Sequence, residues 1–450
     1  MTYAEALAFL YGLLTHRPPG QPTGAVKLDR MRALCALLGH PERGFPAVLV
    51  AGTKGKGSTA AMLAAMATAA GWRVGLYTKP HLVDLCERFQ VDGRWLPPKA
   101  VAALAARVRA AVEAGVGGPG WPPSYFEAAA AMAFLAFAQA RVDLGVIEVG
   151  IGGRLDATNV LDPRLAVITT IDYDHTEIVG TRLAQIAAED AGIMRPGRAV
   201  VTVPQAPAAA RVLEARAARL GARLVRVGRD VRYRTRHVGR DGTVVDVWGR
   251  RGRYAALRVP LLGRHQALNA ACAVAAAEAL VDEGLAVDEA AVRAGLVGLQ
   301  WPARVEVVRD EPVVIVDVAH NVVSFRALRR VLDDVFPGRR VHLVIGLLGS
   351  KDLAGIARVV APRTATVWAV RADDPRALSP EVVAAAFRPQ VADVRVVEDP
   401  VAATGAAIAA AGPQDVVCVA GSFHVAGPVR EHLVGLGRPA LQVTAGVPGD

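Results

Sequence analysis

The sequence predicts an α/β protein: a mostly parallel sheet with a small antiparallel meander in the N-terminal part, and a smaller, Rossmann-like α/β unit in the C-terminal part. Apolar strand candidates alternate with helical segments along most of the 450 residues, which is typical of a parallel sheet covered by helices. Hydrophobic residues make up 52% and aromatic residues only 5% of the chain, so Ala, Val and Leu form most of the core. This composition suits helices packed on parallel strands.

The first part of the chain combines this rhythm with one region of another kind. Segment 223–258 predicts an antiparallel meander, because Val231-Arg232-Tyr233-Arg234 and the stretch 244–248 flank a turn at Asp241 and Gly242. The remaining elements that we expect here are strands near 47–51, 73–78, 144–150, 165–171 and 199–203, and helices near 99–114, 125–140, 181–191, 266–281 and 288–296.

A break at 298–302 separates the two parts, and a second strand–helix rhythm follows it. We place the boundary near 299, which predicts domains at 1–298 and 299–450. The second domain has no phosphate-binding glycine loop of its own. Its strands are expected near 313–318, 341–347, 365–371, 394–398 and 415–420.

Charge and composition disfavour several classes of protein. The net charge is +10, from 52 Lys and Arg against 42 Asp and Glu. No basic cluster is interleaved with aromatic residues, and the densest basic stretch, 229–253, alternates with Val, Tyr and Gly as a solvated hairpin does. Nucleic-acid binding is therefore not favoured. No apolar run reaches the roughly 18 residues of a membrane span, and no secretory signal is evident, so we expect a cytoplasmic protein.

The four cysteines support the same compartment. Cys35, Cys86, Cys272 and Cys418 lie far apart in the sequence and have no metal-ligand spacing. We expect reduced, mostly buried thiols.

The segment 52–59, Gly-Thr-Lys-Gly-Lys-Gly-Ser-Thr, carries the clearest chemical signal. It follows an apolar strand and opens an Ala-rich helix, an arrangement that binds phosphate through backbone N–H groups and the helix N-terminus. Gly57 stands between Lys56 and Ser58, which departs from the usual P-loop pattern. We assign Lys56 to the outer phosphates and Ser58 or Thr59 to phosphate or Mg²⁺. The sequence therefore predicts an ATP site.

Polar side chains end three other predicted strands. Glu148 closes the strand near 144–150, His175 follows the strand near 165–171, and the cluster 317–321 follows the first strand of the C-terminal part. Ligands of open α/β sheets gather at the carboxyl ends of strands, so these groups and the P-loop are expected to meet in a cleft between the domains. His175 is a fair metal or phosphate ligand there. A glycine turn at 151–159 adds one basic and one acidic group, Arg154 and Asp156.

Motifs along nearly the whole chain make it resemble the folylpolyglutamate synthase/dihydrofolate synthase family of the Mur ligase superfamily. The matching blocks keep the order that this family has. They are 50–59, Pro80-His81-Leu82, Glu87-Arg88, Tyr125-Phe126-Glu127, 148–159, Asp174-His175-Thr176, Gly192-Ile193, Gly263-Arg264-His265-Gln266, Asn269-Ala270-Ala271, Trp301-Pro302-Ala303-Arg304 and 317–321.

The resemblance implies an ATP- and Mg²⁺-dependent amide ligase of folate biosynthesis and one-carbon metabolism. A pteroate or folate carboxylate would attack ATP to give an acyl phosphate, and the amino group of L-glutamate would displace phosphate. Such an enzyme must bring two anions together, so it needs cations that offset their repulsion. The family also implies a monomer whose partners are small molecules, without nucleic acid or membrane.

By the same resemblance, residue roles carry over motif by motif. Phosphate contacts fall to Gly55, Lys56, Gly57, Ser58 and Thr59; other ATP contacts to Asn269, Arg304 and Asp317; Mg²⁺ ligation to Ser58, Glu148 and His175; the pterin surroundings to Phe126, Arg154, Leu155, Asp156 and Ala157; and the reacting centre or the incoming glutamate to His320.

Two positions depart from the family pattern. Lys79 stands where the family has a serine of a Mg²⁺ site, and Asp190 stands where it has a lysine that is normally carbamylated. We hypothesise that the changes are coupled and that both residues act in catalysis. The Lys79 ammonium would take over part of the charge of a Mg²⁺ ion, with Asp190 or Glu148 as its partner.

Two other functions stay open on the sequence alone. These departures also allow a Mur-type ligase that acts on a different acid, and a nucleotide-binding protein with reduced or no ligase activity. Phosphate release that needs both an acid and an amine would separate a ligase from a binding protein.

Overall fold

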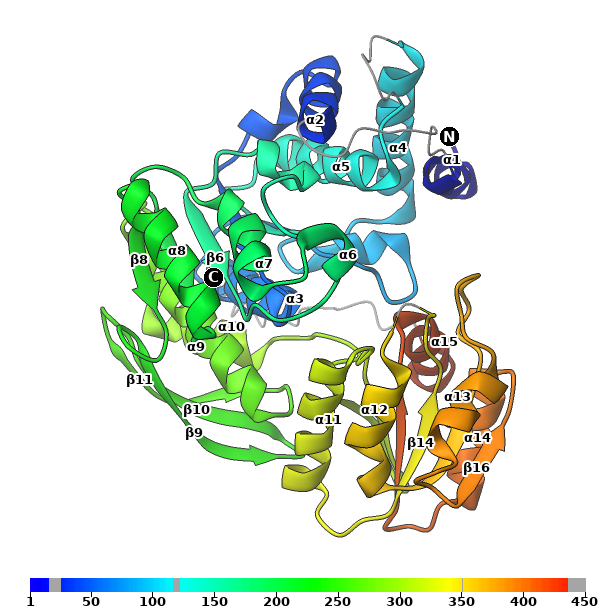
Figure 1. Ribbon diagram of the computed structural model, residues 1–450. Helices are drawn as coiled ribbons and strands as arrows, with labels where there is room; N and C mark the ends of the chain where they lie inside the picture. The colour runs from blue at the N-terminus through cyan, green and yellow to red at the C-terminus, as the bar shows by residue number, and fades with distance from the viewer. Residues whose placement is uncertain (16–25, 116–121, 350, 436–450) are drawn as a thin grey trace, which may run out of the picture.

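The computed structural model describes residues 1–15, 26–115, 122–349 and 351–435 and confirms the predicted α/β class. Figure 1 shows two lobes. In the described residues, the N-terminal lobe contains an eight-stranded and a three-stranded sheet, and the C-terminal lobe contains a six-stranded sheet. The end of the second predicted domain, beyond residue 435, lies outside the described residues.

The large sheet has the strand order β4-β3-β2-β5-β1-β6-β7-β8 and places the P-loop strand near its centre. β1 pairs in parallel with both β5 and β6, and all of its residues are buried, which explains its continuous apolar sequence. The strands are β1 Ala47–Ala51, β2 Val74–Tyr77, β3 Phe89–Val91, β4 Arg94–Trp95, β5 Leu144–Glu148, β6 Leu165–Ile168, β7 Ala199–Thr202 and β8 Arg223–Arg226.

Helices cover both faces of this sheet and form two cores. Leu49 belongs to the core with α1, α2, α4, α5, α7 and α8, whereas its neighbours Val48 and Val50 belong to the core with α3, α9 and α10. The helices are α1 Tyr3–Thr15, α2 Val26–Leu37, α3 Lys56–Ala69, α4 Pro98–Glu113, α5 Tyr125–Ala140, α6 Thr176–Val179, α7 Leu183–Asp190, α8 Pro207–Arg219, α9 Arg264–Val281 and α10 Glu289–Val297.

The predicted meander is confirmed as the antiparallel sheet of β9 Arg232–Gly239, β10 Gly242–Trp248 and β11 Arg253–Val259. The start of segment 223–258 was wrongly included, because β8 pairs in parallel with β7 at the edge of the large sheet. Val225 of β8 is buried in the core under that sheet, and this burial fixes its place.

The six-stranded sheet of the C-terminal lobe has the order β12-β13-β17-β14-β15-β16 and is parallel except for β12. β12 is the one strand of this sheet that the sequence did not predict. The elements are β12 Glu306–Asp310, β13 Val313–Val316, α11 Val322–Val335, β14 Val341–Ile345, α12 Leu353–Val360, β15 Thr364–Ala369, α13 Pro380–Phe387, β16 Asp393–Val396, α14 Pro400–Ala410, β17 Val416–Ala420 and α15 Phe423–Val434.

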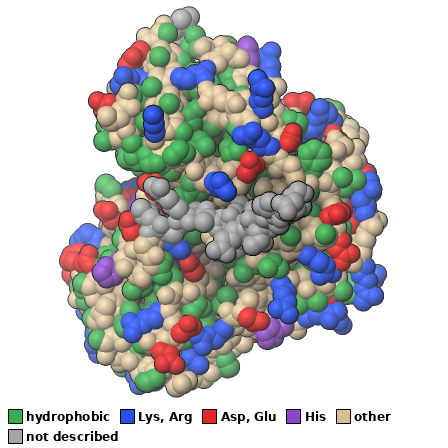
Figure 2. Space-filling model, turned by 180° about the vertical axis from the view of Figure 1, so that it is seen from behind, with side chains coloured by type: hydrophobic (Ala, Val, Ile, Leu, Met, Phe, Trp, Pro, Cys, Tyr) green, Lys and Arg blue, Asp and Glu red, His purple; other side chains and the backbone are tan. Residues whose placement is uncertain are grey.

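Short 3₁₀ helices connect several of these elements: η1 Pro41–Arg43, η2 Leu85–Arg88, η3 Ala157–Val160, η4 Ala191–Ile193 and η5 Ala361–Arg363. Among the described residues, no helix is long and apolar enough to cross a membrane. On the face shown in Figure 2, Lys and Arg side chains are interspersed with Asp and Glu rather than gathered into one patch. We propose that the domain boundary lies near 299, in the segment that joins α10 to β12.

Candidate active site

The P-loop connects β1 to the N-terminus of α3. Gly55 precedes the helix with a φ of 89°, a conformation that favours glycine. A Cβ atom at Gly55 would lie 2.5 Å from Oδ1 of Asn269, so a larger residue there would displace the Asn269 side chain of α9. The ammonium of Lys56 folds over the loop and donates a hydrogen bond to the Gly52 carbonyl at 2.7 Å. Lys56 and Asn269 therefore border the same loop.

Glu148, at the end of β5, lies directly beside this loop. A Cβ atom at Gly57 would be 3.1 Å from the ring of Trp301 and 3.4 Å from Oε2 of Glu148, so the unusual glycine between Lys56 and Ser58 lies between this ring and the carboxylate. The same Oε2 accepts a hydrogen bond from the backbone N–H of Lys79 at 2.9 Å. Burial raises the pKa of Glu148, and Lys56 acts in the opposite direction. The structure thus brings this strand end to the P-loop.

Asp190 faces the loop from the end of α7. Burial raises the pKa of Asp190 to about 6, although Lys56 and the Gly52 N–H favour its ionised form. Its Oδ2 atom is buried and has no hydrogen-bond partner among the described residues. A carboxylate in this state is costly to ionise.

We predict that Asp190→Asn stabilises the protein at pH 8. The pKa of Asp190 is higher in the folded than in the unfolded chain, so its stability contribution is present below pH 4 and is lost as the pH rises through 6. The amide removes this loss, worth at most about 3 kcal/mol. Thermal denaturation from pH 4 to pH 8 measures it. A variant without advantage at pH 8, or with an equal advantage at pH 4, would contradict the assignment.

Lys79 has a different partner from those we hypothesised. Its Nζ atom lies 3.5 Å from Oδ1 of Asp156 and 5.2 Å from the ring centroid of Tyr77. Pairing with Asp190 is wrong, because the ion pair is formed with the acid that caps η3, and Asp190 faces Lys56 from another helix. Toward Glu148, Lys79 offers its backbone N–H and a through-space charge.

A second cluster joins the two lobes around Asp174, and we call it the Asp174 cluster. Oδ2 of Asp174 lies 3.1 Å from Nζ of Lys54 in the P-loop, and Oδ1 lies 3.3 Å from Nζ of Lys351 in the C-terminal lobe. Asn321 donates to Oδ2 at 2.7 Å, and Nε2 of His320 lies 3.8 Å away. Burial alone would raise the pKa of Asp174, but His320 and the two lysines outweigh it and lower the pKa.

The sequence motifs included Asp174 and Asn321 but gave neither a role, and they omitted Lys351. A usable signal existed for Lys351, because it follows β14 and thus lies at a further strand end of the C-terminal sheet.

His175 lies at the edge of this cluster. Its side chain is 41% exposed, with Nε2 4.0 Å from Oδ1 of Asp174. Burial lowers the pKa of His175, although Asp174 acts in the opposite direction. The lowered pKa favours the neutral imidazole, which is the form that binds metals. The same cause lowers the pKa of His320, whose Nδ1 contacts the Val318 carbonyl at 2.9 Å.

The residues at the P-loop fit Mg²⁺ that arrives with a nucleotide rather than a preformed metal cage. In the described part of the chain, no three His, Cys, Asp or Glu side chains gather closely enough to hold a metal ion. The Thr59 hydroxyl is buried without a hydrogen-bond partner there, next to Ser58 and on the helix that Glu148 approaches. Hydroxyl and carboxylate oxygens are the ligands that Mg²⁺ prefers, and it usually completes its shell with phosphates and water.

From the C-terminal lobe, Arg304 reaches back toward the P-loop side. Its guanidinium lies 6.0 Å from the ring of Trp301 and 5.3 Å from the ring of Phe423. Burial lowers the pKa of Arg304, while Asp317 and Glu148 both favour its charged form. Asp317 accepts hydrogen bonds from the N–H groups of residues 305 and 319, at 2.9 and 2.8 Å. These contacts fix the loop that carries Arg304.

The predicted pterin-binding residues do not all lie in one place. Phe126 is 53% exposed at the start of α5. Leu155, Asp156 and Ala157 are partly buried. Asp156 lies beside Lys79, and the other two flank Asp156 in the sequence. Arg154 instead pairs with Glu189 at 2.6 Å at the surface, so the structure does not bring its charge to the P-loop cluster.

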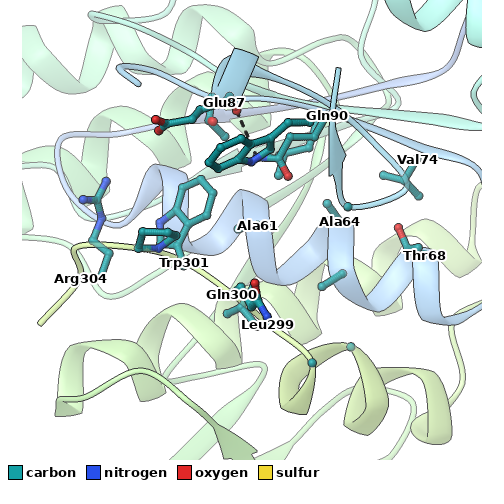
Figure 3. A pocket seen from close by; sticks show the side chains of 18 of the residues that line it. Ala61, Ala64, Thr68, Val74, Glu87, Gln90, Leu299, Gln300, Trp301 and Arg304 are labelled. Atoms are coloured by element: carbon teal, nitrogen blue, oxygen red, sulfur yellow. Dashed lines mark hydrogen bonds between the residues drawn. The ribbon is translucent and has the colours of Figure 1, made fainter. Parts of the chain in front are cut away.

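A cavity of about 720 Å³ borders the site and was not predicted. Figure 3 shows α3 along one wall, with Trp301 and Arg304 at one end and Glu87 and Gln90 on the opposite side. The signal was present in the sequence, because α3 turns small residues toward this space: Ala61, Ala64, Ala65, Thr68 and Ala69 line the cavity.

Comparison with known proteins matches both lobes to ligase domains. Residues 104–277 match the Mur ligase middle domain, and residues 303–423 match the Mur ligase glutamate ligase domain. Dihydrofolate synthase/folylpolyglutamate synthase of Mycobacterium tuberculosis is 39% identical over 376 residues, which cover 80% of this chain and 77% of that protein. The enzyme of the same name from Bacillus subtilis is 32% identical over 434 residues, 96% of this chain and 99% of that one.

Solved structures lead to the same family as the sequence comparisons. Mycobacterium tuberculosis folylpolyglutamate synthase, complexed with ADP and AMPPCP, superposes with a TM-score of 0.87 at 35% identity and covers 96% of this chain and 99% of that chain. E. coli FolC in complex with DHPP and ADP superposes with a TM-score of 0.85 at 32% identity, over 96% of this chain and 98% of that one. The chain belongs to the dihydrofolate synthase/folylpolyglutamate synthase family and is built from Mur ligase domains.

Proposed function

We propose that this protein is an ATP-dependent ligase that adds L-glutamate to dihydropteroate, to folates or to both. The observation that carries the proposal is that groups of both lobes meet at the P-loop, where Asp174 pairs with Lys54. Lys56 and Glu148 lie at the P-loop, while His320, Asn321 and Lys351 reach Asp174 from the other lobe. A ligase needs this arrangement, because an activated acid and an incoming amine must meet.

In the proposed reaction, a carboxylate oxygen of the acid attacks the γ-phosphorus of ATP. An O–P bond forms, the bond to the β-γ bridging oxygen breaks, and ADP leaves. The amino nitrogen of glutamate then attacks the acyl carbon, and phosphate departs with the former carboxylate oxygen. The amine loses its proton to a neutral base, and His320 is suited to this task because burial lowers its pKa.

The chain's own residues bind and orient the two anions. P-loop N–H groups and Lys56 hold the phosphates, and Asn269, Arg304 and Asp317 hold the rest of ATP. Mg²⁺, held by Ser58, Glu148 and His175, would offset the phosphate charge. Phe126, Leu155, Asp156 and Ala157 would surround the pterin. We also propose that the enzyme works as a monomer in the cytoplasm.

The proposal is tested by phosphate release from ATP with each substrate omitted in turn. We expect release only when both an acid, dihydropteroate or tetrahydrofolate, and L-glutamate are present, with a glutamylated product in the mass spectrum. Release with an unrelated acid alone would indicate a different Mur-type ligase. Nucleotide binding without any acid- and amine-dependent release would overturn ligase activity.

A further inference from the structure

Lys79 is a buried cation whose hydrogen-bonding capacity is unused. Its side chain is 9% exposed, at the turn after β2. A Cβ atom at Gly150 would lie 3.2 Å from its Nζ, so the ammonium packs against the chain just beyond Glu148. No hydrogen bond from this Nζ is found within the residues that the structure describes. An ammonium has three donors, and donors buried without acceptors are costly.

Asp156 balances the charge of Lys79 but does not accept a hydrogen bond from its ammonium. Oδ1 of Asp156 already accepts from the N–H of Thr158 at 3.0 Å and from its hydroxyl at 2.6 Å. Oδ2 accepts from the N–H of Gly150 at 3.0 Å. The 3.5 Å separation from Lys79 is longer than a good charge-assisted hydrogen bond. The pair therefore holds the ammonium in place by charge and leaves its N–H groups free for a ligand anion.

The sheet order indicates which anion this is. Lys79 follows β2, Glu148 ends β5 and the P-loop follows β1, and these three strands are adjacent in the order β2-β5-β1. Strands lie about 4.8 Å apart, so the backbone after β2 stands about 10 Å from the phosphate loop, with Glu148 between them. Lys56 therefore lies on the phosphate side of Glu148, and Lys79 lies on the opposite side.

We propose that Lys79 binds the carboxylate of the acid substrate and holds it for attack on ATP. This inference rests on the proposed ligase function and names the group that receives the acid. The ammonium compensates the negative charge of the acid next to Glu148, which would otherwise repel it. Asp156 positions the Lys79 ammonium through their ion pair.

The test compares an acid with its uncharged amide by calorimetry, without nucleotide. The ligands are dihydropteroate, tetrahydrofolate and the carboxamide of each. In the carboxamide of tetrahydrofolate, the amide replaces the γ-carboxylate. We expect Lys79→Met to weaken acid binding about ten- to a hundredfold and to change carboxamide binding less than about twofold. Lys79→Arg should restore part of the preference for the acid. Lys99→Met, an exposed lysine on α4, is the matched control and should change neither.

The other outcomes are distinct. An equal loss of acid and carboxamide binding in Lys79→Met would overturn the role of Lys79 while leaving the ligase function intact. So would a loss of affinity for a non-hydrolysable ATP analogue with unchanged acid binding, because the ammonium would then serve the phosphates. If the unmodified protein binds none of the four pterin compounds, the proposed function fails, and this inference fails with it.

Discussion

Lys56→Met is expected to lower the rate of acid- and amine-dependent phosphate release by about 10²- to 10³-fold. This is the usual effect of removing one enzyme group that stabilises the charge of the transition state. Lys56 has two tasks in the structure. Its ammonium lies inside the phosphate loop, and its charge also favours the ionised forms of Glu148 and Asp190. The substitution removes both effects at once.

Steady-state kinetics at saturating ATP measure this effect, with Lys99→Met as the control for loss of a lysine at an exposed site. Circular dichroism must show that Lys56→Met remains folded. A folded Lys56→Met protein that keeps more than about a tenth of the rate would contradict the position of Lys56 at the phosphates.

Asp174→Ala is expected to reduce the free energy of unfolding by about 3–5 kcal/mol, as loss of one partner from a buried ionic network does. The side chain is only 12% exposed and lies between Lys54 and Lys351, one from each lobe. Without it, two ammonium groups face each other and His320 and Asn321 lose a shared acceptor. The lobes should also separate more easily.

Urea denaturation measures the loss, and small-angle scattering measures the separation of the lobes. Glu177→Ala is the matched control, because this carboxylate is close in sequence, 67% exposed and, among the described residues, forms no ion pair with a lysine. If Asp174→Ala and Glu177→Ala have the same stability, the Asp174 cluster does not hold the lobes together.

Most of the fold was predictable from the sequence because the buried strands have a clear pattern of apolar residues. β1 and β13, for example, are unbroken apolar runs between turn signals. β8 and β12 were harder for a physical reason. Both lie at sheet edges, and their mixed polar and apolar residues resemble those of a solvated hairpin. Only the burial of Val225 against a neighbouring strand distinguishes β8, and this is a tertiary effect.

The site was predictable where chemistry follows a strand end, as at Glu148 and at the P-loop. Partners contributed by another segment were not predictable. Lys79 pairs with Asp156, which is 77 residues further along the chain, and Asp174 is shared by two lobes. Such pairings depend on which strands are neighbours in the sheet, and sequence spacing does not contain that order.

The central claim, that the acid is activated as an acyl phosphate, is tested most directly by isotope transfer. The acid is labelled with ¹⁸O in the reacting carboxylate, and the phosphate released in one turnover with L-glutamate is analysed by mass spectrometry. If the carboxylate attacks ATP, one labelled oxygen appears in each phosphate. Phosphate without label, released together with a glutamylated product, would contradict the account.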